Sequence, residues 1–516
     1  MQEVYDNPLA AHCLDAYCSR DPDLAAEVDF AIVTFGSHEP AHEVAAKILD
    51  LRPWVLGVSC YVWNTDKTLT ICDLVRAADP SVLIVAGGPE AGHVPGEICR
   101  ECPAIDVVVT GEGEETFRHL LLAHLFRQPF DRIPGITFRL NAGKVVSNAR
   151  RPTIDLASFP PLFGSGQDKY LSLLKQKVMY ETIRGCPHVC FFCDWGVLTP
   201  GRIRTFPIAR VERELSYILR NHPTTHLYLA DSEINADDRH GKDLLRAVVR
   251  LKRELGWNGD VTFHLEISKD IDSEMADLLC EATNGIGIGV QSLNKSALYQ
   301  MGRKWFDLER FDHNVRLLER DIHFVFQFIY GCPGDTYRTF FDSLRWAVDG
   351  DRDVWFDRLQ VLPGTIYRHK RERFAIEFER QRPFFATSSN TFSASDMRRA
   401  ESLKRGFHLY NFRNYIEFDA LRDFLGLDSM ELLEAFGEWC TAYQPNRSLT
   451  LSRTDPRTLP DGFLSELTGW IGAFVRSRRP ITWADYSRLS EHLAGSRSAP
   501  AIPASSMAGL RTPRGN

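Results

Sequence analysis

Short apolar runs alternate with amphipathic stretches through residues 28–120 of this 516-residue chain. Four runs rich in valine and isoleucine are typical of buried strands, and three stretches with apolar residues every three or four positions are typical of helices. The predicted strands are 28–35, 55–63, 81–88 and 105–111, and the predicted helices are 41–51, 65–78 and 114–126. This alternation predicts a doubly wound (Rossmann-like) α/β domain with a parallel sheet, which binds ligands at the carboxyl ends of its strands.

The pattern changes at residues 134–161, where a hairpin predicted around Asn141–Gly143 is followed by a proline-rich linker. From residue 176 the alternation of strands and helices returns. The six predicted strands are 178–185, 225–232, 261–268, 285–292, 323–331 and 356–364. Six successive parallel strands with intervening helices predict a partial (β/α)6 barrel, in which the chemistry lies at the carboxyl ends of the strands.

The last third of the chain has helical periodicity. The predicted helices are 393–412, 429–443, 462–476 and 483–495. The final residues are rich in proline, serine, alanine and glycine, which predicts disorder. We therefore expect an N-terminal Rossmann-like domain at 1–130, a linker with a hairpin at 131–175, the partial barrel at 176–370, a helical C-terminal domain at 371–495 and a disordered tail at 496–516.

Charge and composition exclude several classes of function. The net charge of −7 and the isoelectric point near 6.2 argue against a nucleic acid or an anionic membrane as the partner. No apolar run reaches the roughly 20 residues of a membrane helix, and the N-terminus lacks the layout of a signal peptide. We therefore expect a cytoplasmic protein, in which the 12 cysteines stay reduced.

Three of these cysteines form one motif. Cys186, Cys190 and Cys193 lie in the stretch IRGCPHVCFFCDWG, directly after a predicted strand. Cysteine thiolates hold cubane iron–sulfur clusters, normally four to a cluster, so three ligands leave one iron open to a small molecule. A zinc site would need a fourth ligand, and His188 within the loop is expected to point away. The motif therefore predicts a [4Fe–4S] cluster with an open iron.

This spacing, with the aromatic Phe192 before the last cysteine, resembles the signature of the radical S-adenosylmethionine (SAM) superfamily. GVQS at 289–292 with MGRK at 301–304, IYGCPGDT at 329–336 and LQVLPGT at 359–365 resemble the later barrel strands of the class B radical SAM methyltransferases, which also bind cobalamin. The resemblance extends over residues 28–370. It implies that the cluster binds SAM and cleaves it reductively to a 5′-deoxyadenosyl radical.

The resemblance also implies a set of residues that contact SAM. The glycine-rich motif that follows the second barrel strand in the family is replaced here by LADSE. By position, Asp231 and Glu233 would face the methionine part of SAM, Glu266 and Ser268 its ribose and carboxylate, and Arg303 its carboxylate. The full set of implied SAM-binding residues is Phe192, Asp231, Glu233, Glu266, Ser268, Gln291 and Arg303.

The N-terminal domain resembles the cobalamin-binding domain of the same subclass. Three loops carry the resemblance: SCYVWNTDKTL at 59–69, GGPEAG at 87–92 and TGEGEET at 110–116. Glycine in such loops lets the backbone approach a large planar ligand closely. The implied cobalamin-binding residues are Ser59, Tyr61, Trp63, Thr68, Gly87, Gly88, Pro89, Glu90, Gly111, Glu112 and Glu115. The chain lacks the D-x-H-x-x-G motif whose histidine ligates cobalt, so the lower face is expected to lack a histidine, with Trp63 a candidate to shield it.

If both cofactors bind, the resemblance implies a cobalamin-dependent radical SAM methyltransferase. It would move a methyl group from SAM via methylcobalamin to a carbon of a small-molecule or peptide natural product, and an external donor similar to flavodoxin or ferredoxin would reduce the cluster. No catalytic side chain is assigned beyond those that hold the cofactors. A cyclase or rearranging enzyme without methyl transfer, and polar methylation without a radical, stay open as alternatives. A methylthiotransferase would need further cluster cysteines and a basic RNA-binding tail, and a corrinoid carrier would leave the barrel unexplained.

Overall fold

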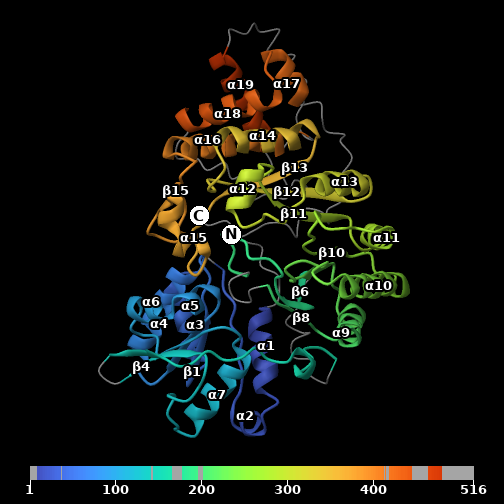
Figure 1. Ribbon diagram of the computed structural model, residues 1–516. Helices are drawn as coiled ribbons and strands as arrows, with labels where there is room; N and C mark the ends of the chain where they lie inside the picture. Colours follow the sequence, from blue (N-terminus) through green and yellow to red (C-terminus); the bar gives the residue numbers. More distant parts are fainter. Residues whose placement is uncertain are drawn as a thin grey trace.

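The computed structural model shows an N-terminal sheet domain, a barrel and a helical layer (Figure 1). The residues it describes are 8–36, 38–140, 143–164, 177–195, 201–411, 413, 418–443 and 463–478. The predicted helix at 483–495 and the predicted tail at 496–516 lie outside these residues. None of the helices in the described ranges is both long and apolar enough to cross a membrane.

The N-terminal domain is built on a five-stranded sheet with the order β1-β2-β3-β4-β5. The strands are β1 (Val55–Ser59), β2 (Leu83–Gly87), β3 (Val107–Val109), β4 (Ile136–Arg139) and β5 (Val145–Ser147). The first three are parallel, and β4 and β5 form an antiparallel hairpin that pairs with β3. The predicted hairpin is thus confirmed, and it extends the sheet of this domain.

Helices cover both faces of this sheet, as a doubly wound domain requires. The helices of this region are α1 (Leu9–Cys18), α2 (Pro22–Glu27), α3 (Ala41–Asp50), α4 (Thr65–Ala78), α5 (Pro89–His93), α6 (Pro95–Glu101) and α7 (Glu114–Leu125). The buried side chains of α3, α4 and α6 form one core with Ile84, Ala86 and Val108. Leu120 and Ala123 of α7 form another with Val85 and Val107 on the opposite face.

The segment 28–35, predicted as a buried strand, forms no strand. Phe30 packs against the small core of Cys18, Leu24 and Leu121, whereas Phe35 packs against the core under α3 and α4. Ile32 packs against the main core, so the apolar residues of this segment pack against different cores instead of pairing with a strand. Val33 is 38% exposed. The prediction was wrong because an unpaired segment of this kind has the same alternation of apolar residues as a paired strand.

The partial (β/α)6 barrel is confirmed. Its six parallel strands are β6 (Lys177–Tyr180), β9 (His226–Leu229), β10 (Asp260–Thr262), β11 (Gly285–Gln291), β12 (His323–Tyr330) and β13 (Asp353–Arg358). The strands form two three-stranded sheets, which a parallel bridge between His264 and Gly287 connects. The last strand is shifted relative to its predicted range of 356–364: it begins at Asp353 and ends at Arg358, because the residues after Leu359 bond to the chain near Phe384 instead.

The helices of the barrel domain follow its strands. They are α9 (Ile208–Asn221), α10 (Asp238–Leu255), α11 (Ser273–Ala282), α12 (Lys295–Gln300), α13 (Leu308–Leu318), α14 (Tyr337–Asp349) and α15 (Ile366–His369). Two antiparallel pairs stand outside the barrel sheet: β7 (Ile183–Gly185) with β8 (Ile203–Thr205), and β14 (Glu377–Phe378) with β15 (Ala386–Ser388). The first pair precedes and follows the three-cysteine motif.

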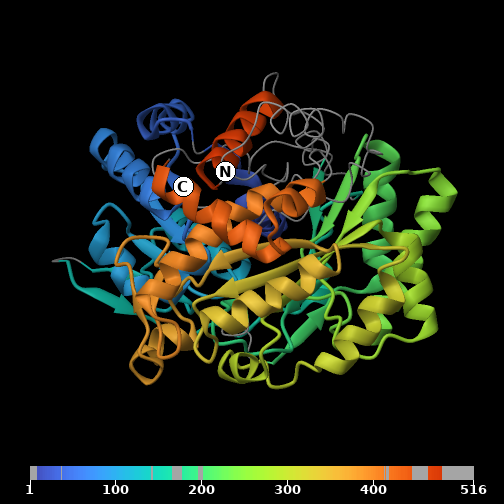
Figure 2. The ribbon, with the colours of Figure 1, turned by 90° about the horizontal axis from the view of Figure 1, so that it is seen from above.

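A helical layer covers the β13 end of the barrel (Figure 1, Figure 2). It consists of α16 (Ala394–Asn411), α17 (Phe418–Leu425), α18 (Ser429–Tyr443) and α19 (Phe463–Arg478). Phe407 of α16 meets Phe356 of β13 edge to face, with ring centroids 4.9 Å apart. Both rings belong to one continuous hydrophobic core, so this layer and the barrel are packed as one body.

Candidate active site

The three cysteines lie on the loop that follows β7. This loop packs against the segment after α12, because Phe191 N donates to Met301 O at 2.8 Å. Gly302 has a φ of +76°, and a Cβ there would lie 2.8 Å from Val189 O. Glycine at this position therefore permits the close contact between the cysteine loop and the MGRK segment.

The three thiols share one electrostatic environment. Burial raises the pKa of the Cys186 thiol to about 11 and that of the Cys193 thiol to about 12, and in both cases the neighbouring Cys190 raises the pKa further. The backbone brings two of them together, since Cys193 N donates to Cys190 O at 3.2 Å. Three neighbouring thiols fit the ligand set of a cubane cluster with one open iron.

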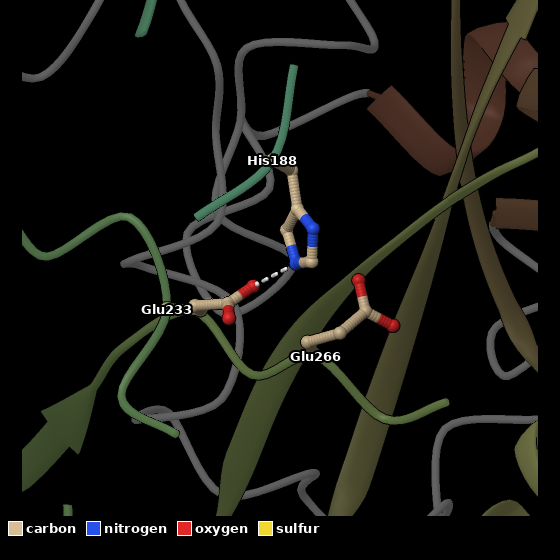
Figure 3. A group of neighbouring side chains, drawn as sticks. All are labelled: His188, Glu233 and Glu266. Carbon is tan, nitrogen blue, oxygen red and sulfur yellow. Dashed lines mark hydrogen bonds and ion pairs between the residues drawn. The ribbon is translucent and has the colours of Figure 1, made fainter. Parts of the chain in front are cut away.

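Three further side chains converge beside this loop (Figure 3). One ligand atom from each of His188, Glu233 and Glu266 lies within 4.8 Å of the others. His188 Nε2 is 2.9 Å from Glu233 Oε2, and its ring stacks on Trp305 with centroids 3.6 Å apart. The His188 ring is thus directed to Glu233 and Trp305, and the group of possible metal ligands that contains it holds no cysteine, in keeping with the expectation that it points away from a metal bound by the thiols.

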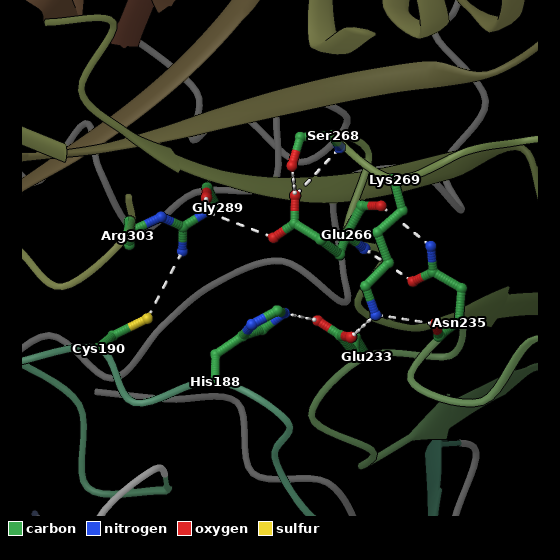
Figure 4. A network of polar contacts seen from close by, with 9 residues as sticks. All are labelled: His188, Cys190, Glu233, Asn235, Glu266, Ser268, Lys269, Gly289 and Arg303. Atoms are coloured by element: carbon green, nitrogen blue, oxygen red, sulfur yellow. Dashed lines mark hydrogen bonds and ion pairs between the residues drawn. The ribbon is translucent and has the colours of Figure 1, made fainter. Parts of the chain in front are cut away.

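Glu266 is the centre of a wider polar network (Figure 4). Its Oε1 accepts hydrogen bonds from Ser268 N at 3.0 Å and Ser268 Oγ at 2.7 Å. Its Oε2 lies 3.3 Å from Arg303 Nη2, which also donates to Gly289 O at 3.0 Å. Arg303 Nη1 lies 4.0 Å from Cys190 Sγ. The predicted residues Glu266, Ser268 and Arg303 are therefore brought together, next to a cysteine of the motif.

Glu233 is paired with two nitrogen groups. Lys269 Nζ contacts Glu233 and also donates to Asn235 O at 3.0 Å. Burial acts to raise the pKa of Glu233, but His188 and Lys269 outweigh it and hold the pKa below its ordinary value. Each of the two buried carboxylates thus faces a cation, Lys269 or Arg303. Alternating carboxylates and cations are complementary to the ammonium and carboxylate of an amino acid, and a bare metal ion would compete with those two cations.

Three predicted SAM residues lie outside this network. Asp231 is fully buried and accepts hydrogen bonds from Thr182 N at 2.7 Å, Thr182 Oγ1 at 2.6 Å and Ile183 N at 2.8 Å. Burial raises the pKa of Asp231 to about 7, against these bonds. Its oxygens therefore hold the turn between β6 and β7 instead of facing a ligand. Gln291 ends β11 at a bulge with a φ of +71°, and Phe192 packs partly buried against the main core.

The glycine loops of the N-terminal domain leave an open surface at the carboxyl ends of β2 and β3. A Cβ at Gly87 or at Gly111 would meet no atom within 4 Å. Gly88 has a φ of +97°, and a Cβ there would lie 2.7 Å from Cys60 O. Gly88 thus lets two loops touch, while the other two glycines form a cradle that side chains would fill. These residues fit a large planar ligand.

The loop after β1 contributes a pair of aromatic rings. Tyr61 stacks on Trp63 with centroids 4.7 Å apart, and Trp63 is 47% exposed. Ser59 is exposed at the end of β1, whereas Thr68 is buried in α4 with 2% exposure. The aromatic pair is therefore placed to contact a ligand, and Thr68 is not.

The three predicted acidic contacts to cobalamin form ion pairs inside the protein. Glu90 pairs with Arg382 at 2.5 Å. Glu112 pairs with Arg204. Glu115 pairs with Arg118 at 2.7 Å and accepts from Tyr17 at 2.6 Å. The role implied for Glu90, Glu112 and Glu115 is therefore not supported, because each carboxylate is already paired with an arginine of the chain. Pro89 begins α5 beside Gly88.

Sequence reasoning missed His188, Lys269 and Trp305 as members of the site. Each lies within two residues of a position that was singled out: Cys186, Ser268 or Arg303. Their closeness in the sequence to Cys186, Ser268 and Arg303 could therefore have marked all three residues as candidates. What the pattern lacked was the direction of each side chain, which the tertiary contacts determine.

Two family models match the chain. The B12 binding domain matches residues 8–121, and the Radical SAM superfamily matches residues 180–347. Among similar proteins is the cobalamin-dependent radical SAM methyltransferase TokK of Streptomyces tokunonensis, 30% identical over 374 residues. Another is the 2-(S-pantetheinyl)-carbapenam-3-carboxylate methyltransferase of Streptantibioticus cattleyicolor, 32% identical over 379 residues. Each match covers 69% of this chain and 54% of the relative, so the chain spans about half the length of these curated relatives.

Two solved structures share the fold over much of the chain. The cobalamin-dependent S-adenosylmethionine radical enzyme OxsB, with aqua-cobalamin and SAM bound, has a TM-score of 0.63 and 17% identity, and the match covers 95% of this chain and 81% of that one. The radical SAM methyltransferase TsrM from Kitasatospora setae, with cobalamin and a [4Fe–4S] cluster bound, has a TM-score of 0.57 and 19% identity, and the match covers 71% of this chain and 72% of that one.

The barrel and its cysteine loop place the chain in the radical SAM superfamily. Because a B12-binding domain precedes that barrel, the chain belongs to the cobalamin-binding radical SAM enzymes. The two matched domains are accordingly those for cobalamin and for radical SAM chemistry, and the three cysteines lie within the second of them.

Proposed function

We propose that this chain is a methyltransferase that moves a methyl group from SAM to a carbon of a small-molecule or peptide natural product. The observation that carries the proposal is the position of the cysteine loop. It lies between the network of carboxylates and cations at the strand ends of the barrel and the glycine cradle of the N-terminal domain. The names of TokK and the carbapenam methyltransferase support the same reaction.

The cofactors supply the radical and the methyl-carrying chemistry when bound, and the protein supplies position and exclusion of water. We propose that Cys186, Cys190 and Cys193 hold the cluster. The amino-acid part of SAM would then lie over Glu233 and Arg303, since a carboxylate binds an ammonium group and a guanidinium binds a carboxylate.

Glu266 and Ser268 would face the ribose in this arrangement. Their mutual hydrogen bond at 2.7 Å fixes the carboxylate before the ligand arrives, so less entropy is lost on binding. Gln291 and Phe192 stay as proposed neighbours of SAM beside the strand end and the cysteine loop. Asp231 is proposed instead as a positioning residue for the turn that leads into β7.

We propose that the backbone at Gly87, Gly88 and Gly111 approaches the corrin ring. The stacked Tyr61 and Trp63 would then lie beneath it, and Trp63 would cover the lower face of cobalt. Ser59 and Pro89 flank these positions and complete the proposed surface.

We also propose the bounds of the two domains, the electron donor and the cellular compartment. The N-terminal domain would extend through Ser147, because β5 belongs to its sheet, and the barrel would begin at Lys177. An external donor similar to flavodoxin or ferredoxin would reduce the cluster. Such donors and reduced thiols are found in the cytoplasm, where we place the enzyme.

The test is an anaerobic reaction of the reconstituted protein with cobalamin, SAM, a low-potential reductant and candidate substrates. S-adenosylhomocysteine and 5′-deoxyadenosine are quantified together, with Cys186→Ala as the control. The proposal predicts both products in similar amounts, dependent on substrate. Substrate-dependent deoxyadenosine without S-adenosylhomocysteine would replace it by a cyclase or rearranging enzyme, and the reverse by polar methylation. Two relatives at 27% identity are named anaerobic magnesium-protoporphyrin IX monomethyl ester cyclases, which supports the cyclase as the alternative function.

A further inference from the structure

The N-terminal domain forms an ion pair with the chain just before the cysteine loop. Arg184 stands two residues before Cys186, and its Nη2 is 2.7 Å from Oε1 of Glu114, the first residue of α7. The side chain of Arg184 is 11% exposed and that of Glu114 is 8% exposed. A second bond, from Arg184 Nε to Glu181 at 2.9 Å, keeps the guanidinium from rotating away. The contact is therefore buried and fixed in direction, which makes it stronger than a surface ion pair.

A second ion pair lies beside the first. Arg204 on β8 is the cross-strand partner of Arg184 on β7. It pairs with Glu112 and donates to Ile154 O at 2.8 Å, while Glu112 accepts from Ile154 N at 3.0 Å. Two paired arginines of β7 and β8 thus bind two glutamates at the start of α7, one in the loop before the helix and one in its first turn. Such a paired arrangement fixes orientation as well as distance.

The end of the cysteine loop also meets the N-terminal domain. Asp194 directly follows Cys193, and its Oδ1 lies 3.8 Å from Nε2 of His93, the last residue of α5. The side chains are 21% and 8% exposed. The His93 ring rests on the barrel chain, because a Cβ at Gly364 would lie 2.2 Å from its Nδ1. Both ends of the loop therefore contact elements of the other domain.

These contacts start from the same elements as the cradle. Glu112 and Glu114 follow Gly111 in the loop after β3, and α5 with His93 follows Gly88 after β2. A displacement of either element would therefore move the cradle and the cysteine loop together.

We propose that Glu112, Glu114 and His93 are positioning residues that hold the cysteine loop at both ends and thereby set the separation between the iron–sulfur cluster and the corrin. This inference rests on the proposed cobalamin and cluster sites. A fixed separation matters because methyl transfer needs the substrate to reach both cofactors in turn, and a misplacement of about 1 Å costs about a hundredfold in rate.

The test uses the double variant Glu112→Gln with Glu114→Gln. Both substitutions keep the size of the side chain and remove its charge. The matched control is Glu39→Gln, which breaks an ion pair with Lys47 inside the same domain, where the two side chains are 23% and 57% exposed. Pulsed EPR measures the dipolar coupling between the reduced cluster and cob(II)alamin, after absorbance and iron content have shown that each protein holds both cofactors.

We expect the wild type and Glu39→Gln to give the same narrow distribution of separations, and the double variant to give a shifted or broader one with both cofactors retained. Should the double variant lose a cofactor, Glu112→Gln alone is measured in the same way, since Arg184 and Glu114 then stay paired. An unchanged distribution in a fully loaded variant would overturn the inference and leave the proposed function standing. If the wild type binds no cobalamin during reconstitution, both this inference and the proposed function are overturned.

Discussion

At the scale of single residues, the site is prepared before any ligand binds. Glu266 is 7% exposed, and Ser268 and Arg303 occupy both of its oxygens. Arg303 is held in turn by Gly289 O and by the faces of Trp305 and Phe306, whose centroids lie 4.7 and 4.9 Å from its Cζ. A ligand therefore meets groups whose direction is already fixed, and binding does not have to order them.

We predict that Glu266→Gln weakens SAM binding without loss of the cluster. A hydrogen bond to a charged group contributes about 1.5–3 kcal/mol, so the dissociation constant should rise by about ten- to a hundredfold. Equilibrium dialysis of SAM against the iron-loaded protein measures this change. The control is Glu274→Gln on the outer helix α11, where the side chain is 50% exposed. Equal affinity in the two variants would remove Glu266 from the SAM site.

How much of the site could be predicted differs from residue to residue. Glu233 and Glu266 follow barrel strands and Arg303 follows α12, and the resemblance to the radical SAM family implied that all three face SAM. Glu90 looked like a ligand contact for the same reason, yet its cation is Arg382, 292 residues further along the chain. A local pattern marks where an acidic group lies but does not show which distant cation neutralises it. The contact of His188 with Glu233 could not be predicted for a related reason, since the direction of its ring depends on the remote Glu233 and Trp305.

At the scale of the elements, the end of β2 holds two adjacent glycines with different surroundings. Gly88 provides a positive φ and room for Cys60, whereas Gly87 faces open space. The fold of each element was largely predictable, because strand and helix periods are local. The unpaired segment 28–35 was not, because pairing depends on the neighbouring strand and not on the alternation of its own residues.

We predict that Gly88→Ala and Gly87→Ala separate stability from cobalamin binding. A side chain at a positive φ costs about 1–3 kcal/mol, and the clash with Cys60 O adds to it, so Gly88→Ala should lower the thermal midpoint. Gly87→Ala meets no protein atom, so it should keep the midpoint and weaken cobalamin binding. Calorimetry and absorbance titration measure the two effects. A normal cobalamin affinity in Gly87→Ala would contradict the proposed cradle.

The first residues of β9 and β10 hold a buried pair that should respond to pH. His226 and Asp260 are neighbours in the ladder, with Nδ1 and Oδ2 3.7 Å apart. Burial lowers the pKa of His226 to about 4 and raises that of Asp260 to about 6. Between pH 4 and 6.5 the unfolded chain binds a proton at His226 that the folded chain does not, so this contribution to stability rises with pH. The contribution of Asp260 falls as pH rises through about 6, because its protonated form is favoured in the folded state.

We predict that His226→Asn removes the first of these contributions. The stability of the wild type relative to this variant should therefore increase from pH 4 to 6.5, by on the order of 3 kcal/mol. The thermal midpoints of the cofactor-free proteins across this range measure the trend. Asp260→Asn should give the opposite slope, and parallel slopes in the two variants would contradict this assignment.

At the scale of the whole molecule, a single arginine connects the chain after the barrel to the N-terminal domain. Arg382 pairs with Asp66 at 2.7 Å, with Glu90 at 2.5 Å and with Glu101 at 2.8 Å. Its side chain is 12% exposed and that of Glu90 is 2% exposed. The two domains are therefore joined at the cysteine loop and again at this cluster, on elements that carry the proposed cradle.

We predict that Arg382→Ala destabilises the protein, because it leaves the buried Glu90 carboxylate without a cation. Breaking a buried pair in this way costs about 3–5 kcal/mol. The control is Arg358→Ala, whose pair with Glu379 is more exposed, at 23% and 42%. Calorimetry of the cofactor-free proteins should show a clear fall in the midpoint for Arg382→Ala and a small change for the control. Equal midpoints would show that Glu90 finds another partner.

Our main proposal is that one site brings SAM at the cluster next to cobalamin. Its most direct test is the EPR spectrum of the reduced cluster, titrated with SAM in the cobalamin-loaded protein, because this measurement needs no substrate. We predict that SAM changes the cluster signal of the wild type, that Glu266→Gln needs more SAM for the same change, and that Cys186→Ala gives no such cluster signal. If the wild type holds iron and cobalamin but SAM does not change the EPR signal of its cluster, the proposal is contradicted.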